Sequence, residues 1–460
     1  MDPNLMTDQR LIHGQWSSRL AFILAASGSA IGLGNIWKFP YLLGENGGGA
    51  FVLVYLACVV GIGLPIMMAE TMLGRRGRQS PINAMTTLAE EAHARPCWGY
   101  LGWLGMLAGF LILSYYSVVA GWSMAYIFKM AGGFLRQATP TEAQQAFLDL
   151  KNAPDMELIW HTAFMGATVL IVSRGVSQGL ERVTRIMMPG LFLMLLTLDI
   201  YAASTPGFSE GMAFLFTPDF SKLTGDSVLV AMGQAFFSLG LGMGSIMVYG
   251  SYLPDHVSIS RSSAFVASAD TLVAIMAGIA IFPVVFSHHL QPGMGPGLIF
   301  ETLPLAFSHM PAGNLFGTLF FVLVFFAAIT SAIALIEPAV AWLSENRGLN
   351  RVRASQYAGL ACWLLGLGSL NSFRDGAEPI WLGQTFFEFV DYLTADILLP
   401  TGGIMIAIFA GWVMRTQDSR SELEMGSLYR YWSILIRYLA PMAVAIIFLR
   451  ALLSAHSSGG

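Results

Sequence analysis

Apolar segments of about 20 residues, the length a helix needs to cross a bilayer, recur along the whole chain. Short polar stretches separate them. The pattern predicts eleven membrane-spanning helices, at residues 17–42, 46–73, 97–131, 156–174, 181–203, 228–252, 262–287, 314–344, 354–371, 379–413 and 430–454. Several of these segments exceed the required length, so we expect those helices to be tilted or broken.

Composition and charge agree with a membrane protein. The chain is 55% hydrophobic and 11% charged, whereas soluble domains carry about 25% charged residues. The net charge of −4 gives no reason to expect a nucleic-acid partner. The three cysteines, Cys58, Cys97 and Cys362, form neither a metal-binding pattern nor a disulfide framework.

Positive charge favours one side of this scheme. That side carries 17 of the 24 Lys and Arg residues: Arg10, Arg19, Arg75, Arg76, Arg78, Arg95, Arg174, Arg182, Arg185, Arg261, Arg347, Arg351, Arg353, Arg415, Arg420, Arg430 and Arg437. The positive-inside rule places this side and the N-terminus in the cytoplasm, and the odd number of spans places the C-terminus outside. The outer side holds long connections at 132–155, 204–227 and 288–313, and the last resembles a loop helix dipping toward the protein.

Two predicted spans are interrupted by glycines. Residues 27–35 read SGSAIGLGN, and residues 238–245, five spans later, read SLGLGMGS. A local break exposes carbonyls that can bind Na⁺ and amides that favour a carboxylate, while Asn35 adds a neutral oxygen. Such breaks in matching positions of two halves point to a transporter binding site. The alternative for the glycines alone is close packing between helices.

Other polar groups in the spans have both a functional and a structural interpretation. Ala327, Thr330 and Ser331 share one helix face and offer three oxygens to a cation, although such hydroxyls usually bond to their own helix. The aromatic pair ending at Phe237 could roof a ligand or could simply pack in the core.

Ionisable residues are costly inside a membrane and default to functional or paired roles. We expect Asp270 to bind an ion, and Glu70 and Glu337 to make structural hydrogen bonds. Lys38 and Asp391, on the outer side of their spans, could pair as a gate or remain two separately solvated charges.

Four segments resemble the neurotransmitter:sodium symporter family. They are SAIGLGNIWKFPYLLGENGGGAFVLVY (residues 29–55), SRGVSQGLERVTRIMMP (173–189), GQAFFSLGLGMGS (233–245) and FFAAITSAIALIEP (325–338). The resemblance follows the family's order over nearly the whole chain.

The resemblance implies an all-α integral membrane fold of the leucine-transporter type. This fold has two inverted five-helix repeats, with helices 1 and 6 unwound at mid-membrane, and here one additional transmembrane helix. The expected organisation is a cytoplasmic segment (1–16), a first repeat (17–203), an extracellular connection (204–227), a second repeat (228–413), a cytoplasmic loop (414–429), an eleventh span (430–454) and a tail (455–460).

The same resemblance implies the binding residues. A first sodium site would use Ala30, Asn35, Ser238 and Asp270, and a second would use Gly28, Ile31, Ala327, Thr330 and Ser331. The substrate pocket would be lined by Ser29, Ala30, Leu33, Gly34, Ile112, Tyr116, Phe237, Ser238, Gly240, Met243, Ser331 and Leu335.

Three details narrow the expected substrate. Gly32 stands where monoamine carriers have an aspartate, so the substrate should bring its own carboxylate. Asp270 and Ala274 replace an asparagine and a serine of chloride-dependent relatives, while Tyr55, Gln234 and Ser238 remain; transport should therefore not need chloride. Gly240 and Met243 leave room for a bulky apolar or aromatic side chain.

One position departs from the family. Relatives carry an arginine ahead of the tryptophan that precedes span 1, where this chain has His13, with Arg10 as an alternative and Glu345 as the acid to be paired. Histidine titrates near neutral pH, so the inner gate is expected to be looser or pH-sensitive.

These features together predict a sodium-coupled symporter that imports amino acids by alternating access. It would be a multi-pass protein of the bacterial inner membrane, with two Na⁺ ions and an amino acid as its ligands, the lipid bilayer around it, and no obligate protein partner. No nucleophile-base arrangement suggests an enzyme. An ion channel and a non-transporting sensor are the alternatives.

Overall fold

Each predicted span is largely helical in the part of the chain that the structure describes. The computed structural model describes residues 14–133, 137–288, 297–374, 376–380 and 383–457. Within these ranges, eight helices are long and apolar enough to cross a membrane. They are α4–η2–α5 (Gly49–Gly77), η3–α7 (Pro96–Ala131), α9 (Pro154–Ser173), η4–α10 (Val176–Ala203), α14 (Ile259–Ser287), α16 (Gly313–Arg347), α18–η7–α19–η8 (Phe386–Val413) and η9–α21–η10–α22, which runs from Gly426 and whose last part, α22, is Ala440–Ser457.

The remaining predicted spans are interrupted or more polar. In the first, α2 (Arg19–Ala30) and η1–α3 (Gly34–Glu45) meet at a bend of 53°. In the sixth, α12 (Gly225–Ser238) and α13 (Ser245–Ser251) flank a non-helical stretch. The ninth is α17 (Arg351–Ser372). The predicted start of the tenth span at residue 379 was too early, because the helix begins at Phe386 after Thr385 caps it.

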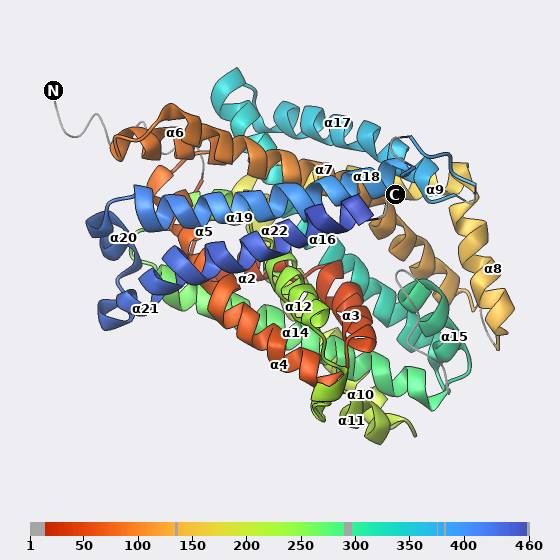
Figure 1. The fold of residues 1–460 in the computed structure, drawn as a ribbon. Coiled ribbons are helices and arrows are strands. Elements are labelled where there is room, and N and C mark those ends of the chain that lie inside the picture. Colours follow the sequence, from red (N-terminus) through yellow and green to blue (C-terminus); the bar gives the residue numbers. More distant parts are fainter. Residues whose placement is uncertain (1–13, 134–136, 289–296, 375, 381–382, 458–460) are drawn as a thin grey trace.

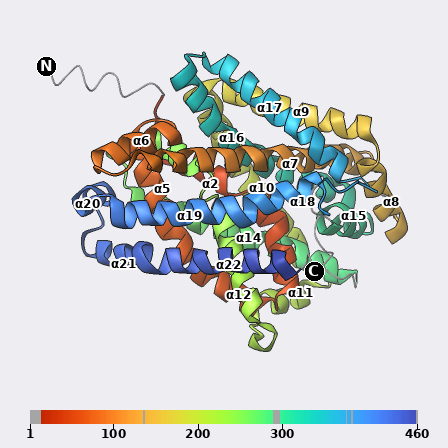
Figure 2. The same cartoon turned by 45° about the horizontal axis from the view of Figure 1, so that its top comes forward.

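Short connecting helices gather at the two ends of the bundle. Figures 1 and 2 show α6 (Pro81–Glu91) and α20 (Thr416–Leu423) at one end. At the opposite end lie α8 (Pro140–Lys151), α11 (Phe208–Phe216) and η6–α15 (Leu298–Ser308). The side chains of η6–α15 are largely buried. The expected loop helix within 288–313 is therefore present and packs against the protein, whereas α6, α8, α11 and α20 were not predicted.

Local signals for two of these helices were present in the sequence. Thr139 and Glu142 form a reciprocal capping box at the start of α8, with Pro140 at its first position. The hydrogen bonds from Thr139 hold the pKa of the Glu142 carboxyl below its ordinary value. At the start of α6, Pro81 occupies the first position after Ser80, but the Ser80 side chain makes no capping hydrogen bond.

Burial separates a central group of helices from an outer one. Most residues in the apolar windows of α16 and α7 are buried inside the protein (78% and 72%), against 28% for α10. The exposed face of α10 carries Ile186, Leu193 and Ile200, and that of α22 carries Met442 and Leu449. Such apolar exposure suits contact with lipid tails, so the central helices, α2 and α12–α13 are left to build the site.

Candidate functional site

Side chains of α16 approach the backbone closely at the break in the first span. Helix α2 ends at Ala30, and Ile31 turns to an extended conformation (φ −73°, ψ 98°). None of the three glycines of this run needs positive φ. A Cβ on Gly32 would lie 2.7 Å from Ser331 Oγ, and one on Gly28 would lie 3.1 Å from Thr330 Cβ. The glycines therefore admit neighbouring side chains to the backbone, while the break itself lies at residues 31–33.

The break between α12 and α13 depends on backbone geometry instead. Gly240, Gly242 and Gly244 adopt φ of 64°, 78° and 73°, the left-handed region where a Cβ is strained. The buried Glu70 carboxylate accepts a hydrogen bond from the Gly242 amide at 3.2 Å. This gives the unwound backbone a buried hydrogen-bond partner at Gly242. Glu70 thus makes the structural hydrogen bond expected of it.

A cavity of about 40 Å³ lies between the two breaks. All twelve residues predicted for the substrate pocket line it, together with Gly32 and Ser245, which were not predicted. The Ser245 hydroxyl is buried and has no hydrogen-bond partner among the described residues. The N-terminus of η1 and the C-terminal ends of α2 and α12 meet here, so partial charges of both signs border the cavity.

Three of the four residues predicted for the first sodium site, Asn35, Ser238 and Asp270, form one buried cluster beside this cavity. Asp270 accepts hydrogen bonds from Asn35 Nδ2 at 2.7 Å and from Ser238 Oγ at 2.8 Å. Tyr55 reaches the same carboxylate at 3.4 Å. The Asn35 oxygen accepts from the Gly32 amide at 3.1 Å, so this side chain presents its NH₂ group to Asp270. Ala30 lines the neighbouring cavity.

The residues predicted for the second sodium site also meet. Ser331 Oγ lies 3.3 Å from the Gly28 carbonyl and 3.4 Å from the Ile31 carbonyl, at the end of α2. Thr330 Oγ1 lies against its own helix, 3.0 Å from the Phe326 carbonyl and 3.1 Å from the Ala327 carbonyl, as the structural alternative for this hydroxyl predicted. The set contains only neutral oxygens, the hard donors that suit an alkali or alkaline-earth cation. α16 and α2 therefore carry the two halves of one oxygen cluster.

The predicted gate residues lie in a second cavity outside the first. Lys38 and Asp391 both line this vestibule of about 230 Å³, with Phe237 and Tyr116 between it and the central cavity. They do not form an ion pair in this structure. Lys38 Nζ instead lies 4.4 Å from the centre of the Phe237 ring.

At the opposite end, the expected histidine interaction falls outside the described residues, because these begin at residue 14. Glu345 accepts hydrogen bonds from the Ser80 amide and from Asn83, each at 2.7 Å. Glu337 binds Tyr252 and Arg351, which agrees with the structural role expected for it.

Sequence reasoning missed a contact that holds the start of α2. Glu181 accepts from the Ser17 amide at 3.0 Å and from the Ser17 hydroxyl at 2.5 Å, and it pairs with Arg185 at 2.5 Å. Trp16 is buried beside them and donates to the Tyr249 carbonyl at 2.9 Å. The i, i+4 spacing of Glu181 and Arg185 was the available signal, but nothing in the sequence linked it to Ser17.

Two unwound helices facing one occluded cavity inside a helical membrane bundle define a secondary transporter. Comparison with known proteins agrees. The family model described as "Sodium:neurotransmitter symporter family" matches residues 13–143 and 149–459. A sodium-dependent transporter of Bacillus subtilis, YhdH, is 39% identical, and the alignment covers 96% of this chain and 98% of that protein. Human sodium- and chloride-dependent GABA transporter 2 is 26% identical, with 97% and 81% covered.

A solved structure is also similar. The crystal structure of MhsT in complex with L-phenylalanine superposes with a TM-score of 0.88 at 42% identity, covering 95% of this chain and all of that chain. The chain belongs to the sodium:neurotransmitter symporter family. Its predicted fold is confirmed, and the protein is a sodium-coupled membrane transporter.

Proposed function

We propose that this protein is a symporter that imports bulky apolar or aromatic L-amino acids with two Na⁺ ions, independently of chloride. The observation that carries the proposal is the convergence at the two breaks. Every predicted pocket residue lines one cavity, and both predicted oxygen clusters touch it. The relative MhsT, crystallised with L-phenylalanine, supports this substrate class.

Sodium is a co-substrate in this scheme. At the first site, Asp270 and Ser238 would bind the ion with the Ala30 carbonyl. Asn35 would join them once its side-chain amide flips, so that its oxygen faces the ion where its NH₂ group now faces Asp270. The second site would use Thr330 with Ser331 and the carbonyls of Gly28, Ile31 and Ala327. The carboxylate of Asp270 gives the first site its fixed negative charge.

The carboxylate of the amino acid would bind near the start of η1. This position offers the positive end of a half-helix and the Tyr116 hydroxyl, which lies 3.4 Å from the Leu33 amide. A side-chain carboxylate at residue 32 has no room, since even a Cβ there would meet Ser331 and Tyr116. The substrate therefore brings its own, next to the first sodium site, which couples the binding of the two.

Chloride independence rests on Asp270. Its carboxylate contacts Tyr55 and Ser238, two of the groups that match the chloride-binding residues of relatives. Ala274, one turn further along α14, offers no hydroxyl. A fixed anion beside the sodium ion takes the place of a mobile one.

The transport cycle would follow alternating access, with the N-terminus cytoplasmic in the bacterial inner membrane. Closing of Phe237 over the substrate, with Lys38 moving from its ring toward Asp391, would seal the outer side. Release of α2 from Glu181 would then open the inner side. In this scheme the first, second, sixth and seventh spans rock against the remaining spans.

Uptake by the purified protein in liposomes tests the proposal. Each of the twenty amino acids is supplied with an inward Na⁺ gradient, with K⁺ in place of Na⁺, and with gluconate in place of chloride. We expect bulky apolar amino acids to accumulate only with Na⁺ and equally in gluconate. Preference for amines, or uptake indifferent to Na⁺, would refute the proposal. Sodium-dependent binding without flux would indicate a sensor, and amino-acid-independent ion current would indicate a channel.

A further inference from the structure

Three arginines end the second span and face acids at the end of the bundle where α6 and α20 lie. Arg75 and Arg76 occupy the last turn of α5 (Leu64–Gly77), and Arg78 caps it in the left-handed region, with φ of 54°. Basic side chains suit the partial negative charge of a helix C-terminus. Each of the three also binds a carboxylate from a distant part of the chain. Capping of α5 does not require these distant contacts, so they need another explanation.

Arg75 makes the strongest of these contacts, to α20, the short helix between the tenth and eleventh spans. Its side chain is 6% exposed. Its Nε donates to the Glu422 carboxylate at 2.8 Å, its Nη2 reaches the same carboxylate at 2.8 Å, and Nη2 also donates to the Glu422 carbonyl at 2.5 Å. Charge-assisted hydrogen bonds from an arginine fork are strong and directional. Because Arg75 is buried, loss of the carboxylate would leave its charge uncompensated.

Arg76 adds a second, weaker connection to α20. Its Nη2 lies 3.2 Å from Asp418, and its Nη1 lies 3.9 Å from Glu422. Its Nε donates to Glu91 of α6 at 3.0 Å. These four side chains are 21–33% exposed, so each pair contributes less than the Arg75 contact. Two adjacent arginines therefore hold α20 against the end of α5.

The arginines also bind the connection between α13 and α14. Arg75 Nη1 donates to the Val257 carbonyl at 2.7 Å. Arg78 donates to the Leu253 carbonyl at 2.5 Å and pairs with Asp255. These contacts join the second span to the connection between the sixth and seventh, and all three spans belong to the group that rocks in the proposed cycle. The contacts lie within this moving group and do not resist its movement.

Backbone packing makes α5 and α13 one unit. A Cβ on Gly74 would lie 1.8 Å from the Met247 carbonyl oxygen, and a Cβ on Gly250 would lie 2.5 Å from the Thr71 carbonyl oxygen. Small residues at such positions let two helix backbones touch. The second and sixth spans therefore move together at this end.

The start of the first span is attached to the same unit. Trp16 donates from its backbone amide to the Tyr252 carbonyl at 3.0 Å and from Nε1 to the Tyr249 carbonyl at 2.9 Å. Its ring also packs edge-on against both tyrosine rings. Contacts thus run without a gap from the start of α2 through α13 and α5 to α20.

The other face of α20 is fixed to the eleventh span. Ser419 Oγ lies 2.6 Å from the hydroxyl of Tyr429 in α21 (Tyr429–Ile434), and Arg437 Nη2 donates to the Thr416 hydroxyl at 3.2 Å. Figures 1 and 2 show α20 and α21 together at this end of the bundle. The tenth and eleventh spans are among those that stay behind when the moving group rocks. The arginine pairs with α20 therefore cross the boundary between the two groups.

We propose that α20 is a latch on the cytoplasmic side of the transporter. The latch consists of the pairs of Arg75 and Arg76 with Glu422 and Asp418, which hold the moving group while the inner side is closed and separate when it opens. It is a closure additional to the contact of Ser17 with Glu181. The inference rests on the alternating access of the proposed function.

Hydrogen exchange of the purified full-length protein tests the latch, in choline chloride without Na⁺ or amino acid. Glu422→Gln keeps the shape of the side chain but removes its charge. It should speed exchange at the start of α2 about tenfold, because the inner side opens more often, and leave exchange in η1–α3, at the outer side, within about twofold. Asp418→Asn should have a smaller effect, about two- to fivefold, because the pair it breaks is partly exposed.

Asp255→Asn is the matched control. It removes the carboxylate partner of Arg78 at the same end of α5, but both partners belong to the moving group. Exchange at the start of α2 should therefore stay within about twofold of that in the unmodified protein. General loosening of this end of the bundle would speed exchange in the control as well.

Ionic strength gives a second test that needs no variant. Raising choline chloride from about 0.01 M to about 1 M shortens the Debye length from about 30 Å to about 3 Å. Exchange at the start of α2, relative to η1–α3, should then become faster in the unmodified protein. The double variant Asp418→Asn/Glu422→Gln should show less of this dependence, because its latch carries no acid to be screened.

A folded Glu422→Gln protein with unchanged exchange at the start of α2 would overturn the proposal. Equal acceleration in η1–α3, or an equal effect of Asp255→Asn, would also do so, because the contact would then be merely structural. If Glu422→Gln does not fold, Asp418→Asn and the ionic-strength series decide. The measurement uses neither substrate nor Na⁺, so its failure leaves the uptake experiment standing, and failure of uptake leaves this result standing.

Discussion

Replacing Gly32 by alanine should damage the amino-acid site and the second sodium site together. The added Cβ would lie 2.7 Å from Ser331 Oγ and 3.1 Å from the Tyr116 hydroxyl. Ser331 cannot move without losing its contacts to the carbonyls at the end of α2, at 3.2 to 3.4 Å. Tyr116 cannot move without leaving the Leu33 amide. One methyl group therefore displaces Ser331 from the proposed second sodium site and Tyr116 from the proposed substrate site.

The expected loss follows from the cost of overpacking. An extra methylene in a tightly packed site typically costs about 1–3 kcal/mol, which corresponds to about 5- to 150-fold in affinity. We expect Gly32→Ala to weaken L-phenylalanine binding by this factor and to raise the Na⁺ concentration that half-saturates it. Gly34→Ala is the matched control, because its Cβ would meet only the edge of the Phe237 ring, at 3.3 Å. That ring can yield by a few tenths of an ångström.

Equilibrium binding of radiolabelled L-phenylalanine at a series of Na⁺ concentrations measures both quantities, with thermal unfolding as a check that each variant is folded. A folded Gly32→Ala protein with the affinities of the unmodified one would refute this assignment of the pocket. A larger loss in Gly34→Ala than in Gly32→Ala would do so too, since it would place the tight contact on the wrong glycine.

Three further substitutions test other parts of the site. Asp270→Asn should raise the Na⁺ concentration needed for uptake at least about tenfold, because the first sodium site loses its charge. Added chloride should lower that concentration again in part, which uptake assays in chloride and in gluconate measure. Ser245→Ala should leave L-phenylalanine affinity within about twofold, since no hydrogen bond is lost; a large loss would show that the hydroxyl holds the substrate. Glu181→Gln should speed hydrogen exchange at the start of α2 about 5- to 150-fold by weakening its contact with Ser17, and unchanged exchange would remove Glu181 from the inner closure.

The central site was predictable because its residues interrupt an otherwise apolar pattern. Glycines, hydroxyls and one aspartate stand out in a span, and a resemblance to one family placed them together. The sequence of the two glycine-rich segments did not show why each position must be glycine. Gly240, Gly242 and Gly244 are required because their backbone φ is positive. Gly32 is required because a side chain there would meet Ser331, about 300 residues away in sequence.

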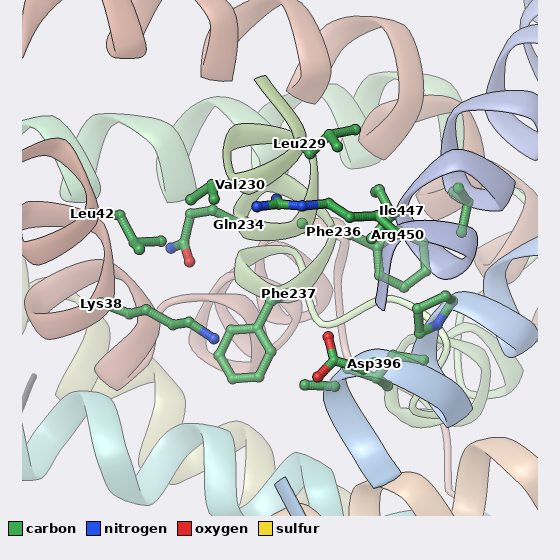
Figure 3. Close-up of a pocket in the computed structure, with 15 residues that line it drawn as sticks. Lys38, Leu42, Leu229, Val230, Gln234, Phe236, Phe237, Asp396, Ile447 and Arg450 are labelled. Carbon is green, nitrogen blue, oxygen red and sulfur yellow. The ribbon is translucent and has the colours of Figure 1, made fainter. Parts of the chain in front are cut away.

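Features built by several distant elements escaped the sequence. The contact of Ser17 with Glu181 joins residues 164 positions apart. The cavity that Asp396 and Arg450 line (Figure 3) needs α12, α22 and the π-helical turn η7 at once, and a hydrophobic pattern does not distinguish that turn from ordinary helix. The sequence alone does not show that Asp396 and Asp391 line different cavities.

The two acids near the outer end of the tenth span lie in different cavities that share Lys38. Lys38 lies over the Phe237 ring and pairs with neither acid in this structure. In the proposed cycle it leaves that ring for Asp391, so the movement that closes the outer gate also frees one face of Phe237, the side chain that covers the substrate. Closing of the gate and covering of the substrate are therefore coupled through one aromatic ring.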